Sequence, residues 1–323
     1  MDRVGPSRSC RKGKSRTLEK HIDENEVILV EVELISTSYN MNAFPDFFKL
    51  EIGKYVDYFV KYLVHNFSDF FDVLKQGILW AVINIELTLQ WLPWWLAIFI
   101  VFLLGWKINK LSSGIVYSVM LVCIGSFGLW ELMMSTLAIV LTSVVISLLI
   151  GIPIGILMAY RDKLETIMKP ILDGMQTMPS FVYLIPAVII FRMGKVPGVF
   201  ATTIYAIAPA IRLTNLAIRG VSKETIEAAR SFGASPWQIL LKVELPQALP
   251  TIMAGVNQTT MMAMSMVVIA SMIGAKGLGS EVLIAINRID IARGTEAGLA
   301  IVFVAIIIDR LTQGIAERFK LPE

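Results

Sequence analysis

Long apolar runs alternate with short polar segments through most of the chain, from Trp91 to its end. A helix that crosses the hydrocarbon core of a bilayer needs about 20 mostly apolar residues. The pattern predicts membrane-spanning helices over residues 93–106, 113–130, 133–160, 170–191, 197–218, 246–273 and 297–315. We therefore expect an all-α, polytopic helical membrane protein, because a helix satisfies its own backbone hydrogen bonds in lipid.

Residues 45–76 show a different pattern, in which aromatic and aliphatic residues at helical spacing are interrupted by lysine and aspartate. Such an amphipathic helix is typical of a membrane interface. Residues 77–90 continue it with a single charge, Glu86, and either lie in the interface or cross the bilayer. We expect residues 41–90 to form this interfacial scaffold. Residues 1–40 mix both signs of charge, and we expect them to be a disordered extension or a non-native tag.

The composition agrees with a membrane protein, since 55% of the residues are hydrophobic and 17% are charged. The net charge of +3 is explained by basic residues in cytoplasmic loops, so nucleic acid is not expected as a partner. Alternating the spans puts the following basic segments on the cytoplasmic side: Lys107 with Lys110, residues 161–169, residues 219–242 and the C-terminal segment. Arg192 and Lys195 are then left outside, where basic residues are less common.

The interval 219–246 is too polar to lie in lipid, yet its pattern is that of folded structure. A first short helix is predicted from apolar residues that recur at every third position: Ile226, Ala229 and Phe232. Ser222 can cap its N-terminus, and Gly233 supplies the left-handed residue that ends it.

A second short helix is predicted directly after the first. Ser235 is its expected N-cap, Pro236 takes the first helical position, and Gln238 completes a capping box. Leu245 and Pro246 are expected to close the interval.

The spacing within this interval resembles the EAA loop of ABC importer permeases. The matching positions are Glu227, Ala228, Ala229, Gly233, Leu245 and Pro246, and Val243 stands where the family usually has isoleucine. Val243 keeps the branched apolar shape. Small alanines allow a partner to approach the helix closely, and Glu227 offers that partner a charge. An ordinary cytoplasmic loop would not also require a glycine and a Leu-Pro pair at these offsets.

The resemblance extends beyond the loop. Residues 176–188, 197–215, 250–259, 267–279 and 296–313 are similar to permeases of glycine betaine/proline importers. The resemblance implies the transmembrane fold of a type I ABC importer over residues 131–316, preceded by two accessory helices in 91–130 and followed by a cytoplasmic tail, 317–323. It also implies a multi-pass protein of the bacterial cell membrane. Lys276 departs from the family, which tends to have a small residue there.

The resemblance further implies a mechanism. The helix of residues 222–233 would dock on a cytoplasmic ABC ATPase subunit, and ATP-driven closure of two such subunits would rock two copies of this chain between inward and outward states. An extracytoplasmic solute-binding protein would deliver a compatible solute for osmoprotection, most closely glycine betaine, proline or a related quaternary amine; choline and carnitine also stay open. The chain would be a non-catalytic subunit with no cofactor of its own, since ATP is bound by the partner.

The sequence itself offers no ATPase motif. Gly13-Lys14-Ser15 resembles the end of a P-loop, but Arg8 stands where the loop needs its first glycine. Two cysteines and two histidines, far apart, imply no metal site.

Candidate pathway residues come from polar and helix-breaking positions inside the spans. Asn257, Gln258 and Thr259 are part of a polar run, which either lines the pathway or bridges a dimer interface. Pro179 breaks the span 170–191, and such a break either lines a cavity or is a packing kink. The alternative function is an ATP-independent secondary transporter or channel, which is disfavoured because the spans hold few ionisable residues for ion coupling.

Overall fold

The computed structural model describes residues 52–318. The chain divides into two units, residues 1–58 and 59–323. The described part of the first unit is the start of helix α2 (Ile52–Asn66). The expectations for residues 1–40 and for the tail beyond residue 318 lie outside the described residues. Within 52–318 every regular element is a helix, which confirms the all-α class.

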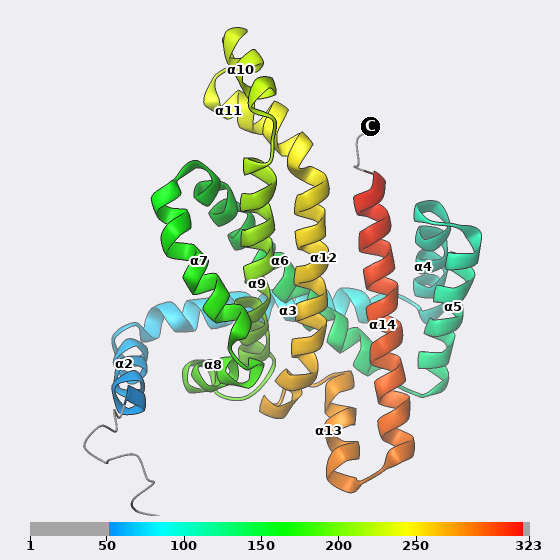
Figure 1. The fold of residues 1–323 in the computed structure, drawn as a ribbon. Helices are drawn as coiled ribbons and strands as arrows, with labels where there is room; N and C mark the ends of the chain where they lie inside the picture. The colour runs from blue at the N-terminus through cyan, green and yellow to red at the C-terminus, as the bar shows by residue number, and fades with distance from the viewer. Residues whose placement is uncertain (1–51, 319–323) are drawn as a thin grey trace, which may run out of the picture. The chain divides into compact units, whose positions relative to one another are not determined.

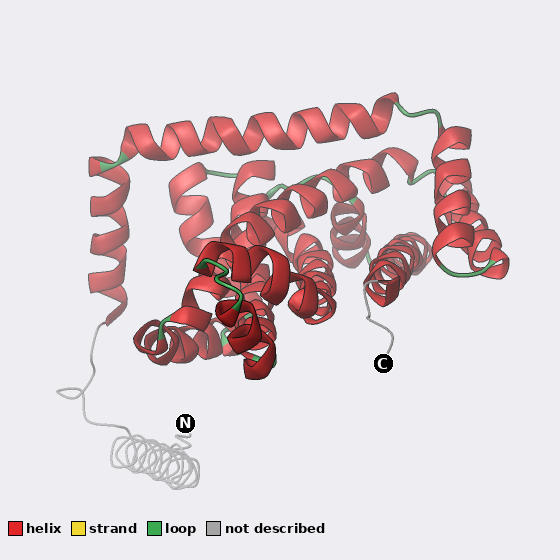
Figure 2. Cartoon of the chain, turned by 90° about the horizontal axis from the view of Figure 1, so that it is seen from above, coloured by secondary structure: helices red, strands yellow, loops and turns green. Residues whose placement is uncertain are grey.

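After the end of α2, the second unit continues with a helix that lies crosswise. Helix α3 (Ser68–Trp91) runs across α6 and α9, and Figure 2 shows it side-on along one edge of the bundle. The part of the predicted amphipathic helix 45–76 that the structure describes, residues 52–76, is not one helix, because α2 ends at Asn66 and α3 takes in residues 77–90; residues 45–51 lie outside the described residues. The chain turns by 97° into α4 (Trp94–Ile108) at Pro93, since the residue before a proline is held extended.

Helices α4 and α5 (Leu111–Ser126) form a hairpin with small residues at its crossing. A side chain on Gly105 would meet Gly114 and Tyr117, so the two backbones approach closely. The predicted span 113–130 ends too late, because α5 stops at Ser126 and Gly128 turns the chain with a φ of 72°. Both helices are shorter than the length that crosses a bilayer unaided.

Four helical segments have the length and the apolar composition to cross a membrane. They are α6 (Trp130–Tyr160), α9 (Lys195–Arg219), the run Pro236–Ile273 that contains α12 (Leu245–Ala270), and α14 (Ile291–Arg318). These confirm the predicted spans 133–160, 197–218, 246–273 and 297–315. Gly151 and Gly155 allow α6 to approach α9 closely, since a Cβ at either position would collide with side chains of α9.

The predicted span 170–191 is wrong as a single helix. Instead α7 (Asp162–Thr177), the 3₁₀ turn η2 (Ser180–Tyr183) and α8 (Leu184–Phe191) follow one another with a bend of 107°. Met178 before Pro179 is extended, so the helix breaks there. Pro186 causes no break, because the first turn of a helix tolerates proline. With each bent pair counted as one span, the described residues hold up to six spans and not seven.

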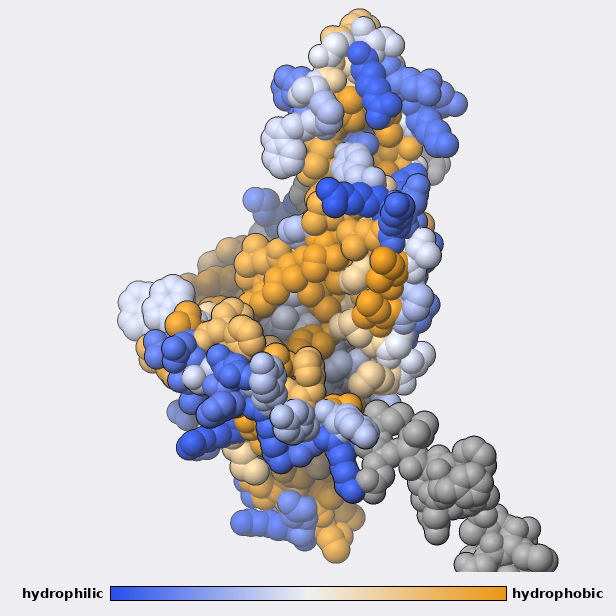
Figure 3. Space-filling view, turned by 90° about the vertical axis from the view of Figure 1, so that its left-hand side faces the viewer, coloured by the Kyte–Doolittle hydropathy of each residue, from blue (hydrophilic) through white to orange (hydrophobic). Residues whose placement is uncertain are grey.

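The helices give the unit two distinct ends (Figure 1). Helices α10 (Lys223–Ser231) and α11 (Pro236–Ile239) project beyond α9 and α12 at one end, which we call the loop end. At the far end, η4 (Ser271–Ile273) and an unpredicted helix, α13 (Leu278–Arg288), join α12 to α14. In the face shown in Figure 3, hydrophobic residues form a belt and hydrophilic residues gather at the loop end and below the belt. This is the surface of a multi-pass membrane protein.

Candidate functional site

The first helix of the loop end has the caps that its sequence predicts. The Ser222 side chain accepts the backbone N–H of Thr225 at 3.4 Å. Gly233 follows α10 with a φ of 80°, and its N–H donates to the Arg230 carbonyl at 2.9 Å. A Cβ at Gly233 would meet no atom within 4 Å, so the glycine is required by backbone conformation and not by space.

The second helix also begins as predicted. Ser235 and Gln238 form a reciprocal capping box, with N···O distances of 2.9 and 3.4 Å. Leu245 and Pro246 do not interrupt the helix, however. Helix α11 passes through a π-helical turn, η3 (Leu240–Glu244), into α12, so residues 236–273 form one continuous helical run. Proline fits because it falls in the first turn of α12.

One side of the loop end packs on the bundle. Ile226 and Leu245 lie against a buried cluster from α9, η3, α12 and the segment after α9: Ala217, Ile218, Val221, Leu240, Ala248 and Ile252. The opposite side is exposed, including Glu227 and Ala228, with Ala229 half-buried. Phe232, at the tip, is 92% exposed, and Trp237 is 67% exposed. The exposed side of the loop end thus carries two large aromatic side chains beside charged residues of both signs, which are Lys223, Glu224, Glu227 and Arg230.

Two long-range contacts anchor the loop end, and neither was predicted from the sequence. The Tyr160 hydroxyl at the end of α6 donates to the Glu244 carboxylate, which is only 4% exposed. Arg219 at the end of α9 pairs with Asp162 at 2.7 Å and with Glu165 at 3.1 Å. The second contact joins the two basic segments that the topology places on one side, and so puts them at the same end of the bundle.

The candidate pathway residues have unlike surroundings. Asn257 donates to Asp309 on α14 at 3.0 Å and accepts from Thr312, so it bridges two helices. Gln258 is exposed, whereas Thr259 is fully buried and its hydroxyl has no hydrogen-bond partner in the described part of the chain. The three side chains therefore do not share one surface. Pro179 lies exposed at the bend between α7 and α8.

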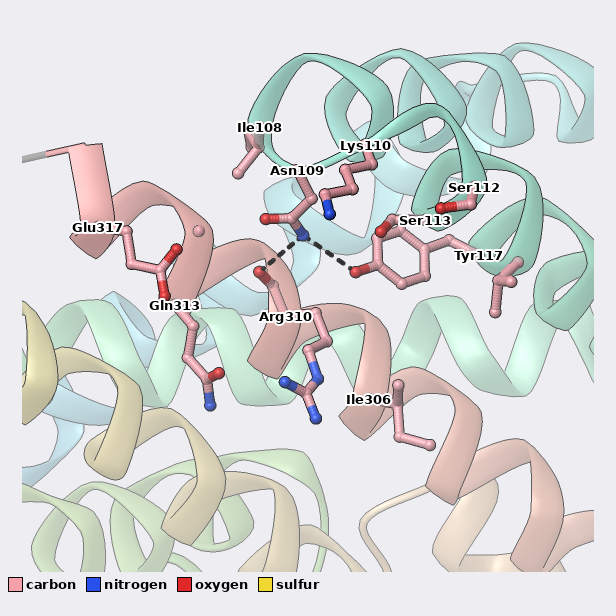
Figure 4. A pocket seen from close by; sticks show the side chains of 12 residues that line it. Ile108, Asn109, Lys110, Ser112, Ser113, Tyr117, Ile306, Arg310, Gln313 and Glu317 are labelled. Atoms are coloured by element: carbon pink, nitrogen blue, oxygen red, sulfur yellow. Dashed lines mark hydrogen bonds between the residues drawn. The ribbon is translucent and has the colours of Figure 1, made fainter.

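A separate cavity of about 630 Å³ lies between the α4–α5 turn and α14 (Figure 4). Asn109 spans it, donating to the Tyr117 hydroxyl at 3.1 Å and to the Arg310 carbonyl at 3.4 Å. A Cβ on Gly314 would collide with the turn, which shows how closely α14 approaches it. None of the predicted site residues lines this cavity. It lies where the accessory hairpin of α4 and α5 meets the last helix.

The described residues contain no group of three or more His, Cys, Asp or Glu placed to hold a metal ion. The features that stand out are a bundle of membrane-spanning helices and a capped loop with an exposed face. Together they define a multi-pass membrane protein with a folded, capped loop at one end.

Comparison with known families makes the class specific. Residues 151–320 match the family described as binding-protein-dependent transport system inner membrane component, and the chain belongs to this family. The fold is also that of the permease in the solved inward-facing MetNI methionine ABC transporter, with a TM-score of 0.53 at 23% identity over 58% of this chain and 94% of that chain. This confirms the type I importer fold.

Curated relatives are more similar in sequence. The glycine betaine/carnitine transport permease of Listeria monocytogenes serotype 1/2a (strain 10403S) is 47% identical, over 85% of this chain and 99% of that protein. The glycine betaine/proline betaine permease of Escherichia coli (strain K12) is 46% identical, over 79% and 72%. The glycine betaine permease of Bacillus subtilis (strain 168) is 44% identical, over 84% and 96%.

Proposed function

We propose that this permease couples to a separate cytoplasmic ATPase through the exposed face of its loop end. The carrying observation is that Glu227 and Ala228 are exposed on a short helix whose ends are both fixed by caps. A helix held in this way can transmit a push without bending, as a rocking mechanism requires. Gly233, Leu245 and Pro246 set its position relative to α12.

The chain itself is proposed to be non-catalytic. Its exposed apolar tip, Phe232, needs a partner surface, and binding of a rigid aromatic side chain is a common source of affinity between proteins. ATP is bound by that partner, and the permease needs no cofactor. We further propose a pair of identical permease chains and an extracytoplasmic solute-binding protein, as the name of the family implies for the latter.

The proposed solute is glycine betaine or a related quaternary amine, taken up for osmoprotection. Support comes from the names of three relatives at 44–47% identity, which all include glycine betaine. Relatives whose names give trimethylamine N-oxide, carnitine alone or choline are 37%, 30% and 31% identical. Among the three candidate pathway residues of α12, Gln258 is the one left exposed by this chain, so it is the side chain we assign to the solute path or to the second copy.

Reconstitution tests the function directly. The permease, its ATPase and its binding protein are placed in liposomes, and uptake of radiolabelled glycine betaine is measured with and without ATP. We expect uptake only with ATP and all three components. Uptake by the permease alone would overturn the proposal in favour of an ATP-independent transporter or channel. ATP-dependent uptake of another solute, such as choline, would overturn only the solute assignment.

A further inference from the structure

Two charges that stand apart in the sequence meet in the structure. Glu86 is the single charge of residues 77–90, and Lys195 is a basic residue left on the outer side by the topology. The Lys195 ammonium lies 2.5 and 2.6 Å from the two oxygens of the Glu86 carboxylate. Their side chains are 25% and 12% exposed, respectively. Ser135 of α6 donates a further hydrogen bond to Glu86 at 2.6 Å.

The pair lies where several segments of the far end meet. Lys195 is the first residue of α9 and follows a tight turn in which Arg192 and Gly194 have φ values of 66° and 134°. The Gly194 N–H donates to the Ile273 carbonyl at 2.9 Å, which joins this turn to η4, directly after α12. We call residues 192–195 with residues 273–274 the far corner.

Glu86 reaches the far corner from outside the family domain. Helix α3 precedes residue 151, where the family match begins, whereas the far corner lies within that match. Helix α3 lies crosswise against α6, α8 and α9, and its other contacts with the bundle are apolar, through residues such as Phe71, Ile78 and Val82. A charge pair at one point of the contact fixes its register.

We propose, on the basis of the transport function proposed above, that Glu86 and Lys195 are positioning residues that fasten α3 to the far corner. Helix α3 and the outer end of α9 then move as one body while the permease alternates between its two states. The pair can hold α3 in place because removing either partner leaves a largely buried charge uncompensated, which is costly.

The first test uses neutral and exchanged charges in the complete reconstituted importer. We expect Glu86→Gln and Lys195→Met to lower uptake about tenfold, with a smaller loss of ATP hydrolysis, and the double variant E86K/K195E to recover most of it. The matched control is Asp173→Asn, which breaks an exposed pair with Arg212 and should leave uptake unchanged. Full uptake in both single variants, or equal loss in the control, would overturn the proposal.

The second test separates motion from assembly. In a C10S/C123S background, E86C/K195C is joined after reconstitution by a flexible bifunctional thiosulfonate reagent that a reductant cleaves. We expect the linked importer to take up solute and the cleaved importer to lose uptake. Inactivity of the linked form, relieved by cleavage, would show that the contact opens during transport. Equal activity before and after cleavage would show that the pair serves assembly only. ATP dependence of the wild-type importer, measured in parallel, tests the proposed function separately.

Discussion

The loop end and the far corner hold their shape by different means. At the loop end, neighbouring residues in the sequence cap two helices, so that Ser222 and Ser235 each bond a backbone amide three positions away. At the far corner, Glu86 and Lys195 come from positions 109 residues apart. Local hydrogen bonds allow the loop end to keep its conformation when a partner subunit moves against it. A long-range ion pair instead determines which helices move together as one body.

The difference matches the roles that we propose for the two ends. A surface that docks on another subunit has to be rigid before contact, since ordering it on binding would cost affinity. A joint between helices has to transmit movement through a contact that water and lipid do not compete for. Buried charge pairs meet that need, because separating them is costly.

The largest effect that tests this difference is expected from removing the long-range contact of the loop end, which is the hydrogen bond between Tyr160 and Glu244. We expect Tyr160→Phe to destabilise residues 236–250 by about 2 kcal/mol, roughly thirtyfold in amide exchange, because the buried Glu244 carboxylate loses its donor. Hydrogen exchange of this segment measures the effect. The control is Tyr205→Phe, which removes a partly buried hydroxyl that makes no hydrogen bond in residues 52–318. Unchanged exchange in Tyr160→Phe would mean that local caps alone hold the loop end.

A smaller effect is expected at the left-handed turn. Gly233→Val should cost about 1–2 kcal/mol, because a β-branched residue is strained at a φ of 80°. Gly233→Asn is the matched control, since asparagine tolerates this conformation. We expect the valine variant to keep its membrane abundance and ATP hydrolysis but to lose solute uptake per ATP, with the asparagine variant near wild type. Equal losses in both variants would point to space and not to conformation.

The sequence predicted those parts of the fold whose cause is local. Helices α6, α9, α12 and α14 follow from apolar length, and the caps at Ser222 and Ser235 follow from residue type and spacing. The bend at Pro179 was also foreseen as a break. The breaks at Asn66 and at Ser126 were missed because apolar residues continue on both sides of them, and helix α13 was missed because it lies between two predicted spans, where no element was expected.

The functional contacts divide in the same way. The EAA-like spacing located the loop end, yet nothing in the sequence relates Tyr160 to Glu244 or Glu86 to Lys195. Within its own segment, none of these four residues stands in a motif that would indicate a long-range partner. The polar run at Asn257 was expected to line the pathway or to bridge a dimer interface, whereas in the structure Asn257 bonds Asp309 on another helix of the same chain. Pairing of this kind depends on how helices cross, which a single sequence does not encode locally.

The most direct test of the central claim is the affinity of the ATPase subunit for the permease with an altered loop tip. Phe232 is 92% exposed, so Phe232→Ala should leave the permease itself intact. We expect the alanine variant to bind the purified ATPase about tenfold more weakly, as loss of an aromatic anchor does. Trp91→Ala, which removes an aromatic side chain that is 85% exposed outside the loop, should bind it as the wild type does. Unchanged ATPase affinity in Phe232→Ala, or equal weakening in both variants, would contradict docking at the loop end.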